Sequence, residues 1–266
     1  MKVVAITGGA RGFGLEMAKE FRKNNYNVVI IDVNKDALYD AEIELAKIKS
    51  KKEVISLVSD ITNEKDVKNI IDTINNKFNR IDIWINNAGV NQSDNYVWDL
   101  EASEIEKLIK IDLIGTMICS SKVSKYMINQ GYGSIYNVEG HGSNDAKIDK
   151  LTVYGTAKRG VTYFTESLAH ELKPYNITVG KITPGIMITN FIYHSLGDGK
   201  ELTIDDKTKK IYNILGDYPE TIAKFMVEKI INNKKKNPKF VWLSNFRAFT
   251  RFMTYPFTKR DLFNNK

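Results

Sequence analysis

Tyr154 and Lys158 are four residues apart, a spacing that places both side chains on one face of a helix. A free phenol has a pKa of about 10 and is a poor base at neutral pH. A neighbouring ammonium group stabilises the phenolate and lowers that pKa, so the pair can exchange a proton near neutral pH. The alternative is a tyrosine and a lysine on a solvated helix surface.

The same spacing occurs a second time, at Tyr255 and Lys259. Because the chain holds 13 tyrosines and many lysines, such a match arises readily by chance. The second pair includes Pro256 and follows the last predicted strand, so we interpret it as a decoy.

A glycine-rich loop, TGGARGFG at 7–14, separates an apolar β-branched run from a helical pattern. Gly8 permits a tight turn, Gly12 lets a pyrophosphate approach the backbone, and Gly14 allows close packing of helix on strand. The helix N-terminus then offers free N–H groups to phosphates. The loop predicts a dinucleotide site, although such loops are also found as simple turns.

Asp32 ends the second apolar run, where a carboxylate can bind both hydroxyls of an adenine ribose and repel a 2′-phosphate. It favours NAD over NADP. Arg11 has the opposite effect, because a cation beside that ribose could pair with a phosphate. The sequence therefore predicts NAD and leaves NADP as the alternative.

The elements that must position these residues alternate regularly. Strands are predicted at 3–8, 27–32, 53–60, 81–89, 133–140, 177–185 and 239–243, with helices between them, including a long one at 102–130 and another at about 153–173. Strict alternation predicts an α/β fold, a doubly wound Rossmann-type parallel sheet of about seven strands with helices on both faces. We expect one domain, 1–243, followed by a basic aromatic tail, 244–266.

On these motifs the chain resembles the short-chain dehydrogenase/reductase family, and NVEGHGS with YGTAK resembles the branch that includes chlorophyll b reductases. The resemblance covers about residues 3–190 and implies a nicotinamide-dependent oxidoreductase, with Tyr154 as acid/base and Lys158 also holding the cofactor. The positively charged nicotinamide is expected to act with Lys158 in lowering the pKa of the phenol. The resemblance also implies a set of cofactor contacts: Thr7, Gly8, Gly12, Phe13, Gly14, Asp32, Asp60, Ile61, Asn87, Ala88, Gly89, Tyr154, Lys158, Pro184, Gly185 and Thr189. The charge argument above adds Arg11 to this set.

The chain departs from that family at two positions. Asp112 stands where the family has a proton-relay asparagine, and Gly140 stands where it has a serine. On the branch pattern the serine has moved to Ser143, where it is predicted to donate to the substrate oxygen; the alternative is a turn residue. His141 is a weaker candidate donor, and the three histidines show no metal-ligand spacing.

The segment after Pro184 and Gly185 supplies apolar residues that predict a lid over a hydrophobic carbonyl or alcohol substrate: Ile186, Met187, Ile188, Phe191, Ile192, Tyr193 and Leu196. Packing of these residues on the sheet is an equal alternative. In the tail, Phe246, Phe249, Phe252 and Met253 lie at helical spacing beside Arg247 and Arg251. This pattern is compatible with an anionic membrane surface, but we expect the aromatic face to pack on the parent domain or on a subunit and leave the arginines in water.

The composition limits the alternatives. A single cysteine, no signal-peptide pattern and no long apolar run predict a cytoplasmic protein. Residues 234–266 carry nine Lys or Arg and one acid within a chain of net charge +7, so the basic residues form an appendage and a nucleic-acid face is not expected. A homodimer or homotetramer is the family's usual assembly. Rival functions are a dinucleotide-binding protein without catalysis and a peripheral membrane module.

Overall fold

The computed structural model describes residues 2–189, 206–258 and 260–263. Seven parallel strands form one sheet in the order β3-β2-β1-β4-β5-β6-β7. Their bounds are β1 Val3–Thr7, β2 Asn27–Asp32, β3 Val54–Val58, β4 Ile83–Asn86, β5 Gly133–Val138, β6 Ile177–Thr183 and β7 Lys239–Val241. The predicted doubly wound parallel sheet of seven strands is confirmed.

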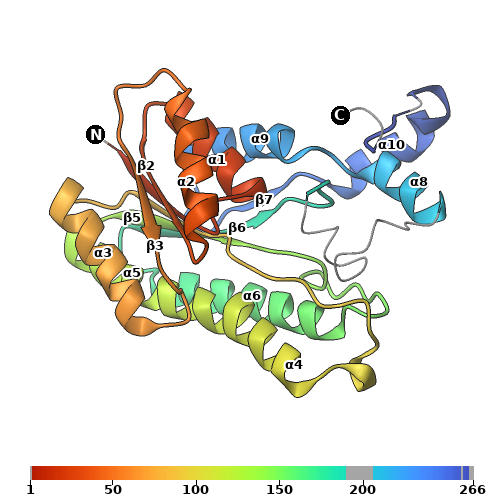
Figure 1. Cartoon of the computed structure of the whole chain (residues 1–266), viewed down its shortest axis with the longest axis horizontal. Helices are drawn as coiled ribbons and strands as arrows, with labels where there is room; N and C mark the ends of the chain where they lie inside the picture. The colour runs from red at the N-terminus through yellow and green to blue at the C-terminus, as the bar shows by residue number, and fades with distance from the viewer. Residues whose placement is uncertain (1, 190–205, 259, 264–266) are drawn as a thin grey trace.

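Helices cover both faces of the sheet (Figure 1). On one face lie α1 (Gly12–Lys23), α2 (Lys35–Ala46) and α9 (Pro219–Ile231), and on the other α3 (Glu64–Phe78), α5 (Thr116–Gln130) and α6 (Thr152–Glu171). Successive residues of β1 point to opposite faces, so Val4 and Ile6 belong to the first core and Val3 and Ala5 to the second. Two separate cores explain why these strands are almost wholly apolar.

The helix starts follow from local chemistry. The side chain of Asn34 accepts a hydrogen bond from the backbone N–H of Ala37 at the start of α2, and Asn63 accepts one from Lys65 at the start of α3. Both asparagines thereby satisfy an N–H that the first helical turn leaves unpaired. Pro219 occupies the first turn of α9, where its missing N–H costs nothing.

The predicted helix at 102–130 is not one regular helix. A π-helical segment, η2 (Lys110–Gly115), joins α4 (Ala102–Ile109) to α5. Gly115 lies close against Ile61, because a Cβ at this position would be 2.8 Å from Cδ1 of Ile61 and that side chain would have to shift. Such a segment changes the angle at which side chains leave the helix, and it contains Asp112.

A short 3-10 helix, η1 (Val97–Asp99), lies between β4 and α4. The C-terminal part of the chain includes α8 (Asp206–Leu215), β7 and α10 (Asn245–Thr258). The predicted tail helix is confirmed, but its arginines are not left in water and its aromatic face does not pack on the parent domain; packing of that face on a subunit stays a prediction. Phe246, Phe249 and Phe252 are exposed, whereas Arg247 and Arg251 bond to the protein. Within the described ranges, we find no helix with the length and apolar character needed to span a bilayer.

Candidate active site

The carboxyl ends of β1 and β4 meet where the strand order reverses, which is where open α/β sheets bind ligands. The hydroxyl oxygen of Thr7 accepts hydrogen bonds from the N–H groups of Asn87 and Ala88, at 3.0 and 3.1 Å. The amide of Asn87 donates to the carbonyl oxygens of Thr7 and Gly8, both at 3.1 Å. The two predicted motifs, at 7–14 and 86–89, therefore form one rigid unit.

The glycine loop fits a phosphate group. Gly8 and Gly12 have φ angles of +60° and +52°, which favour glycine. A Cβ on Gly8 would lie 2.8 Å from Cα of Ala88, and one on Gly14 2.1 Å from the carbonyl oxygen of Gly8. A Cβ on Gly12, by contrast, would lie 3.8 Å from its nearest contact, Cγ2 of Thr189, so there is open space over the backbone of Gly12. Phosphate oxygens can reach it.

Arg11 and Phe13 flank this loop differently. Arg11 is exposed at the N-cap of α1 and has no acceptor atom, so it leaves the first N–H groups of the helix available to phosphate oxygens. The Phe13 side chain is buried in the core beneath the loop. Of Phe13, only the backbone can face a cofactor.

The predicted adenosine contacts gather at the carboxyl edge of β2 and β3. Asp32 is half-buried, and its carboxylate accepts a bond from the N–H of Asn34 at 3.1 Å. Its carbonyl oxygen accepts a bond from Ser59, which brings Asp60 to the same edge. Asp60 is exposed, whereas the side chain of Ile61 is buried. Asp32 and Asp60 can thus face one ligand, while Ile61 supports η2 from below.

The segment after β6 returns toward the glycine loop. Pro184 is buried, and Gly185 has a φ angle of +76° beside Leu243. Thr189 comes beside Gly12, as the contact above shows. Of the predicted lid residues, Ile188 is buried and Met187 packs against the core. Phe191, Ile192, Tyr193 and Leu196 lie outside the described residues.

Tyr154 and Lys158 lie in the first turns of α6, with the Lys158 ammonium 5.5 Å from the centre of the tyrosine ring. Asp112 Oδ2 is 2.9 Å from Lys158 Nζ, and these side chains are 0% and 7% exposed. Asp112 Oδ1 accepts a bond from the N–H of Val90 at 2.7 Å, and a Cβ on Gly89 would lie 3.0 Å from Oδ2. The carboxylate of Asp112 thus joins the segment after β4 to α6.

Burial controls the pKa values of this group. Burial raises the pKa of Tyr154 above its ordinary value; Lys158 opposes the rise and Asp112 adds to it. Lys158 lowers this pKa as predicted, but burial outweighs it; the further lowering predicted from a positively charged nicotinamide stays a prediction. Burial alone would lower the pKa of Lys158, but Asp112 beside it raises that pKa. Tyr154 is consequently a protonated phenol and Lys158 a cation at neutral pH.

Gln92 positions this helix and was missed by sequence reasoning. It is buried, and its side-chain oxygen accepts bonds from the N–H groups of Val153 at 2.9 Å and Tyr154 at 3.3 Å. It caps α6 at the residue that carries the phenol. Because it lies about 60 residues upstream in a loop, no local capping pattern reveals it.

The surroundings of Gly140 show why this position carries no serine, and Ser143 lies close by in the same loop. A Cβ on Gly140 would lie 2.3 Å from the phenol oxygen of Tyr154, so no side chain fits there with the ring in place. Gly142, with a φ of +91°, lets the loop touch Gly155 of α6. Ser143 is buried, accepts a bond from the N–H of Gly140 at 3.3 Å and donates to the carbonyl oxygen of Lys158 at 3.2 Å. The loop curls inward as expected; donation by Ser143 to a substrate stays a prediction.

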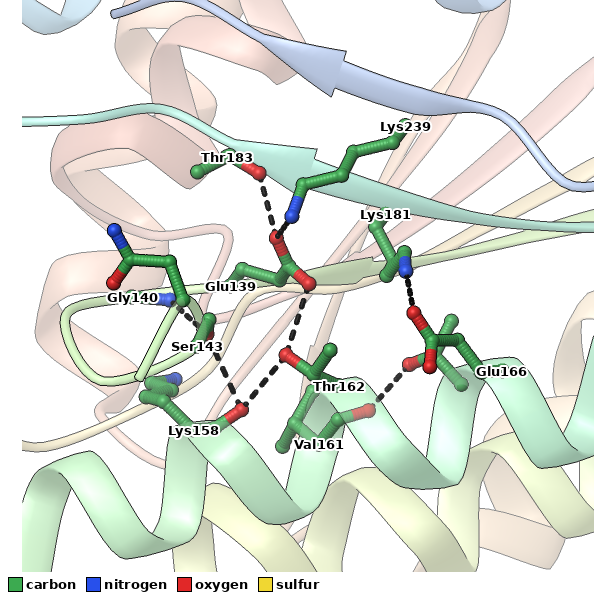
Figure 2. Close-up of polar contacts among 12 residues, drawn as sticks. Glu139, Gly140, Ser143, Lys158, Val161, Thr162, Glu166, Lys181, Thr183 and Lys239 are labelled. Carbon is green, nitrogen blue, oxygen red and sulfur yellow. Dashed lines mark hydrogen bonds and ion pairs between the residues drawn. The ribbon is translucent and has the colours of Figure 1, made fainter. Parts of the chain in front are cut away.

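Glu139 lies in a polar cluster between β5, β6, β7 and α6 (Figure 2). Its carboxylate accepts bonds from the hydroxyls of Thr162, at 2.9 Å, and Thr183, at 2.6 Å, and forms an ion pair with Lys239 at 3.1 Å. Three donors satisfy a carboxylate that is fully buried. This acid therefore fixes the loop of Ser143 against α6.

His141 is half-buried, and burial lowers its pKa. Its Nε2 atom is buried without a hydrogen-bond partner among the described residues. Across 2–189, 206–258 and 260–263 we find no group of three His, Cys, Asp or Glu side chains placed to hold a metal. A lone imidazole of this kind can donate one hydrogen bond, and it remains the alternative to Ser143.

Comparisons with known proteins agree with this geometry. The family model described as short chain dehydrogenase matches residues 2–196. The chain is 31% identical to chlorophyll(ide) b reductase NOL of Oryza sativa subsp. japonica, over 94% of this chain and 74% of that protein.

Solved structures agree as well. A short chain dehydrogenase from Bacillus anthracis is 30% identical with a TM-score of 0.77, covering 90% of this chain and 94% of that one. NAD+-bound xylitol dehydrogenase is 25% identical with a TM-score of 0.80, covering 91% and 98%. The chain therefore belongs to the short-chain dehydrogenase/reductase family of nicotinamide-dependent oxidoreductases.

Proposed function

We propose that the protein transfers hydride between the nicotinamide of NAD and the carbonyl or alcohol carbon of a hydrophobic small molecule. One observation carries this proposal: a buried Tyr154, Lys158 and Asp112 set adjoins a glycine loop whose backbone is open to a pyrophosphate. A surface tyrosine and lysine would show neither the burial nor the carboxylate partner.

Each side chain has a role that follows from its surroundings. Tyr154, protonated because burial raises its pKa, donates its proton to the carbonyl oxygen during reduction. The bound cofactor supplies or accepts the hydride. The cation of Lys158 favours loss of the phenol proton, and Asp112 holds that cation in place.

Ser143 is the proposed donor to the developing negative charge on the substrate oxygen. Its hydroxyl would have to leave the carbonyl oxygen of Lys158. That carbonyl keeps a second hydroxyl within reach, because Thr162 Oγ1 lies 3.1 Å away. Thr162 has only one hydroxyl proton, which it donates to Glu139, but Lys158 lies inside α6, where backbone carbonyls accept N–H groups one turn further on. Rotation of Ser143 therefore does not leave this buried carbonyl without a donor, which lowers the cost of the rotation.

The preference for NAD rests on Asp32. Its carboxylate lies at the carboxyl edge of β2, where it would bind ribose hydroxyls and repel a 2′-phosphate. Arg11, the residue that would favour NADP, is exposed at the start of α1, whereas Asp32 lies at the end of β2.

The hydrophobic substrate class is supported by a third apolar cluster around the phenol. Tyr154 and Val153 pack with Val90, Leu100 and Leu151. The rice relative is by name a reductase of chlorophyll(ide) b, which is consistent with a hydrophobic carbonyl compound. We propose that class for this chain and not that compound.

The test is turnover of NADH and NADPH with a panel of aliphatic and aromatic aldehydes and ketones. Tyr154→Phe should lower kcat/KM at least about a hundredfold while NADH still binds. Tyr39→Phe, at an exposed tyrosine on α2, is the matched control and should retain activity. A wild-type protein that binds NADH, turns over no carbonyl compound and is unaffected by Tyr154→Phe would be a binding protein and not an enzyme.

We further propose a homodimer or homotetramer. Ile114, Met117 and Tyr163 are exposed on η2, α5 and α6, the surfaces that the family resemblance assigns to subunit contacts. Light scattering on the purified chain gives the mass directly; a monomer at micromolar concentration would refute the assembly.

A further inference from the structure

Helix α10 exposes a row of large apolar side chains. Phe246, Phe249, Phe252, Met253 and Phe257 are between 50% and 88% exposed. Their spacing of three to four residues places them on one side of the helix. Single exposed apolar residues are ordinary, but five on one helix form a continuous patch of the kind that marks a binding surface.

The opposite side of α10 is fixed to the protein by its arginines. The guanidinium of Arg247 lies 3.8 Å from the centre of the Trp242 ring and donates to the carbonyl oxygen of Trp242 at 2.7 Å. Arg251 forms an ion pair with the buried carboxylate of Asp217 at 2.7 Å. Arg260, just beyond the helix, binds the second oxygen of Asp217 at 2.7 Å. These contacts set the rotation of the helix and hold the phenylalanines outward.

The charge around this patch indicates what covers it. Residues 245–258 contain no acidic residue. Helix α8 packs against α10 at the same end of the molecule (Figure 1), and it exposes Lys207, Lys209 and Lys210. If two copies of the chain paired through this end, their exposed lysines would repel each other. An anionic surface would instead attract these lysines.

The shape of the patch favours the same occupant. A projecting row of phenylalanines on one helix suits insertion at the boundary of headgroups and acyl chains, where aromatic side chains lose water without needing a matched groove. We infer that the α8–α10 end of the protein docks on an anionic lipid bilayer, with the phenylalanines of α10 inserted and the lysines of α8 facing the headgroups. This inference does not depend on the proposed enzymatic function.

Flotation of the full chain with vesicles tests it. The vesicles are phosphatidylcholine alone, or phosphatidylcholine with about 30% phosphatidylglycerol. The variants are wild type, Phe249→Ser/Phe252→Ser/Phe257→Ser, and Tyr39→Ser as a matched control, because Tyr39 is an equally exposed aromatic residue on α2. Circular dichroism and NADH binding confirm that each variant is folded, and light scattering gives its mass.

Wild type and Tyr39→Ser should float with the anionic vesicles, at least about tenfold more than with the neutral ones. The triple variant should lose about tenfold or more, since each phenylalanine that leaves water contributes roughly that factor or more. Absence of wild-type binding to anionic vesicles, or equal binding by the triple variant, would overturn the inference. So would a fall in oligomeric mass for the triple variant without any lipid binding, because a second copy of the chain would then be the occupant.

Discussion

Asp112 Oδ2 lies 2.9 Å from Lys158 Nζ, and both side chains are buried. The family has an asparagine at the position of Asp112. In this chain the carboxylate that replaces it pairs with Lys158. A buried ammonium without a carboxylate would tend to lose its proton. Here the two charges compensate each other, and the carboxylate also accepts a bond from Val90. The cost is a negative charge near Tyr154, which disfavours its phenolate.

Asp112→Asn should move the pH profile of alcohol oxidation to lower pH. Oxidation needs the phenolate of Tyr154 as base, and Asp112 raises the pKa of that phenol. The asparagine oxygen can still accept a hydrogen bond from the Lys158 ammonium and so keeps this cation in place. Removal of the negative charge then lowers the pKa of Tyr154, so the phenolate becomes available at lower pH and the rising limb of kcat/KM follows it. Asp94→Asn, which removes an exposed carboxylate, is the control and should leave the limb in place. A limb that stays or moves upward in Asp112→Asn would contradict the assignment.

Gly140→Ala should reduce activity, although it brings position 140 closer to the serine found in the family. The added methyl would lie 2.3 Å from the phenol oxygen and 3.0 Å from Cζ of Tyr154, so the ring must shift. A displacement of that size at the reacting group costs roughly a hundredfold in kcat/KM.

Gly155→Ala is the matched control for Gly140→Ala. Its methyl group meets only Cα of Gly142, at 3.7 Å, which is an ordinary contact. This variant should keep its activity. Equal activities in the two variants would show that Tyr154 can move without loss.

The fold could be predicted from the sequence because its signals are local. Buried parallel strands appear as short apolar runs, and the glycine loop follows the first of them. The π segment could not be found in this way, since its sequence, KIDLIG, has an ordinary helical pattern. Its glycine lies against Ile61, which is 54 positions away in the sequence, so no local pattern reveals the contact.

The site was predictable to the extent that it consists of motifs. Tyr154, Lys158 and the loop of Thr7 were found because their spacing carries the chemistry. Gln92 and Thr162 were missed because their roles depend on which element lies opposite them. The opposing effect of burial on the pKa of Tyr154 was also missed, since burial is a property of the folded protein.

Ser143→Ala should lower kcat about a hundredfold, with little change in the affinity for NADH, if its hydroxyl donates to the developing oxyanion. His141→Ala should stay within about fivefold of wild type, as expected for a residue outside the reaction. The reverse result, with His141→Ala severely impaired and Ser143→Ala active, would transfer the donor role to His141, whose Nε2 is buried.

Asp32→Ala should move cofactor preference toward NADPH. Loss of the carboxylate removes repulsion of the 2′-phosphate and two bonds to the ribose of NAD. We expect the ratio of kcat/KM for NADH over NADPH to fall at least about tenfold, measured with one carbonyl substrate under saturating conditions. Asp36→Ala, four residues further along in the first turn of α2, is the control. An unchanged ratio would locate the determinant elsewhere, and Arg11→Ala would then be examined.

Thr183→Val should destabilise the protein without altering the chemistry. The hydroxyl of Thr183 donates to the fully buried carboxylate of Glu139 at 2.6 Å, and a hydrogen bond to a buried charge is worth about 1.5–3 kcal/mol. Valine has the same shape and cannot donate, so the free energy of unfolding in urea should fall by about that amount. Thr178→Val, on the same strand but without a side-chain hydrogen bond in the described part of the chain, should change it by less than about 0.5 kcal/mol. Equal stabilities of Thr183→Val and wild type would contradict this prediction. They would mean that Lys239 and Thr162 are sufficient donors to the Glu139 carboxylate in the cluster of Figure 2.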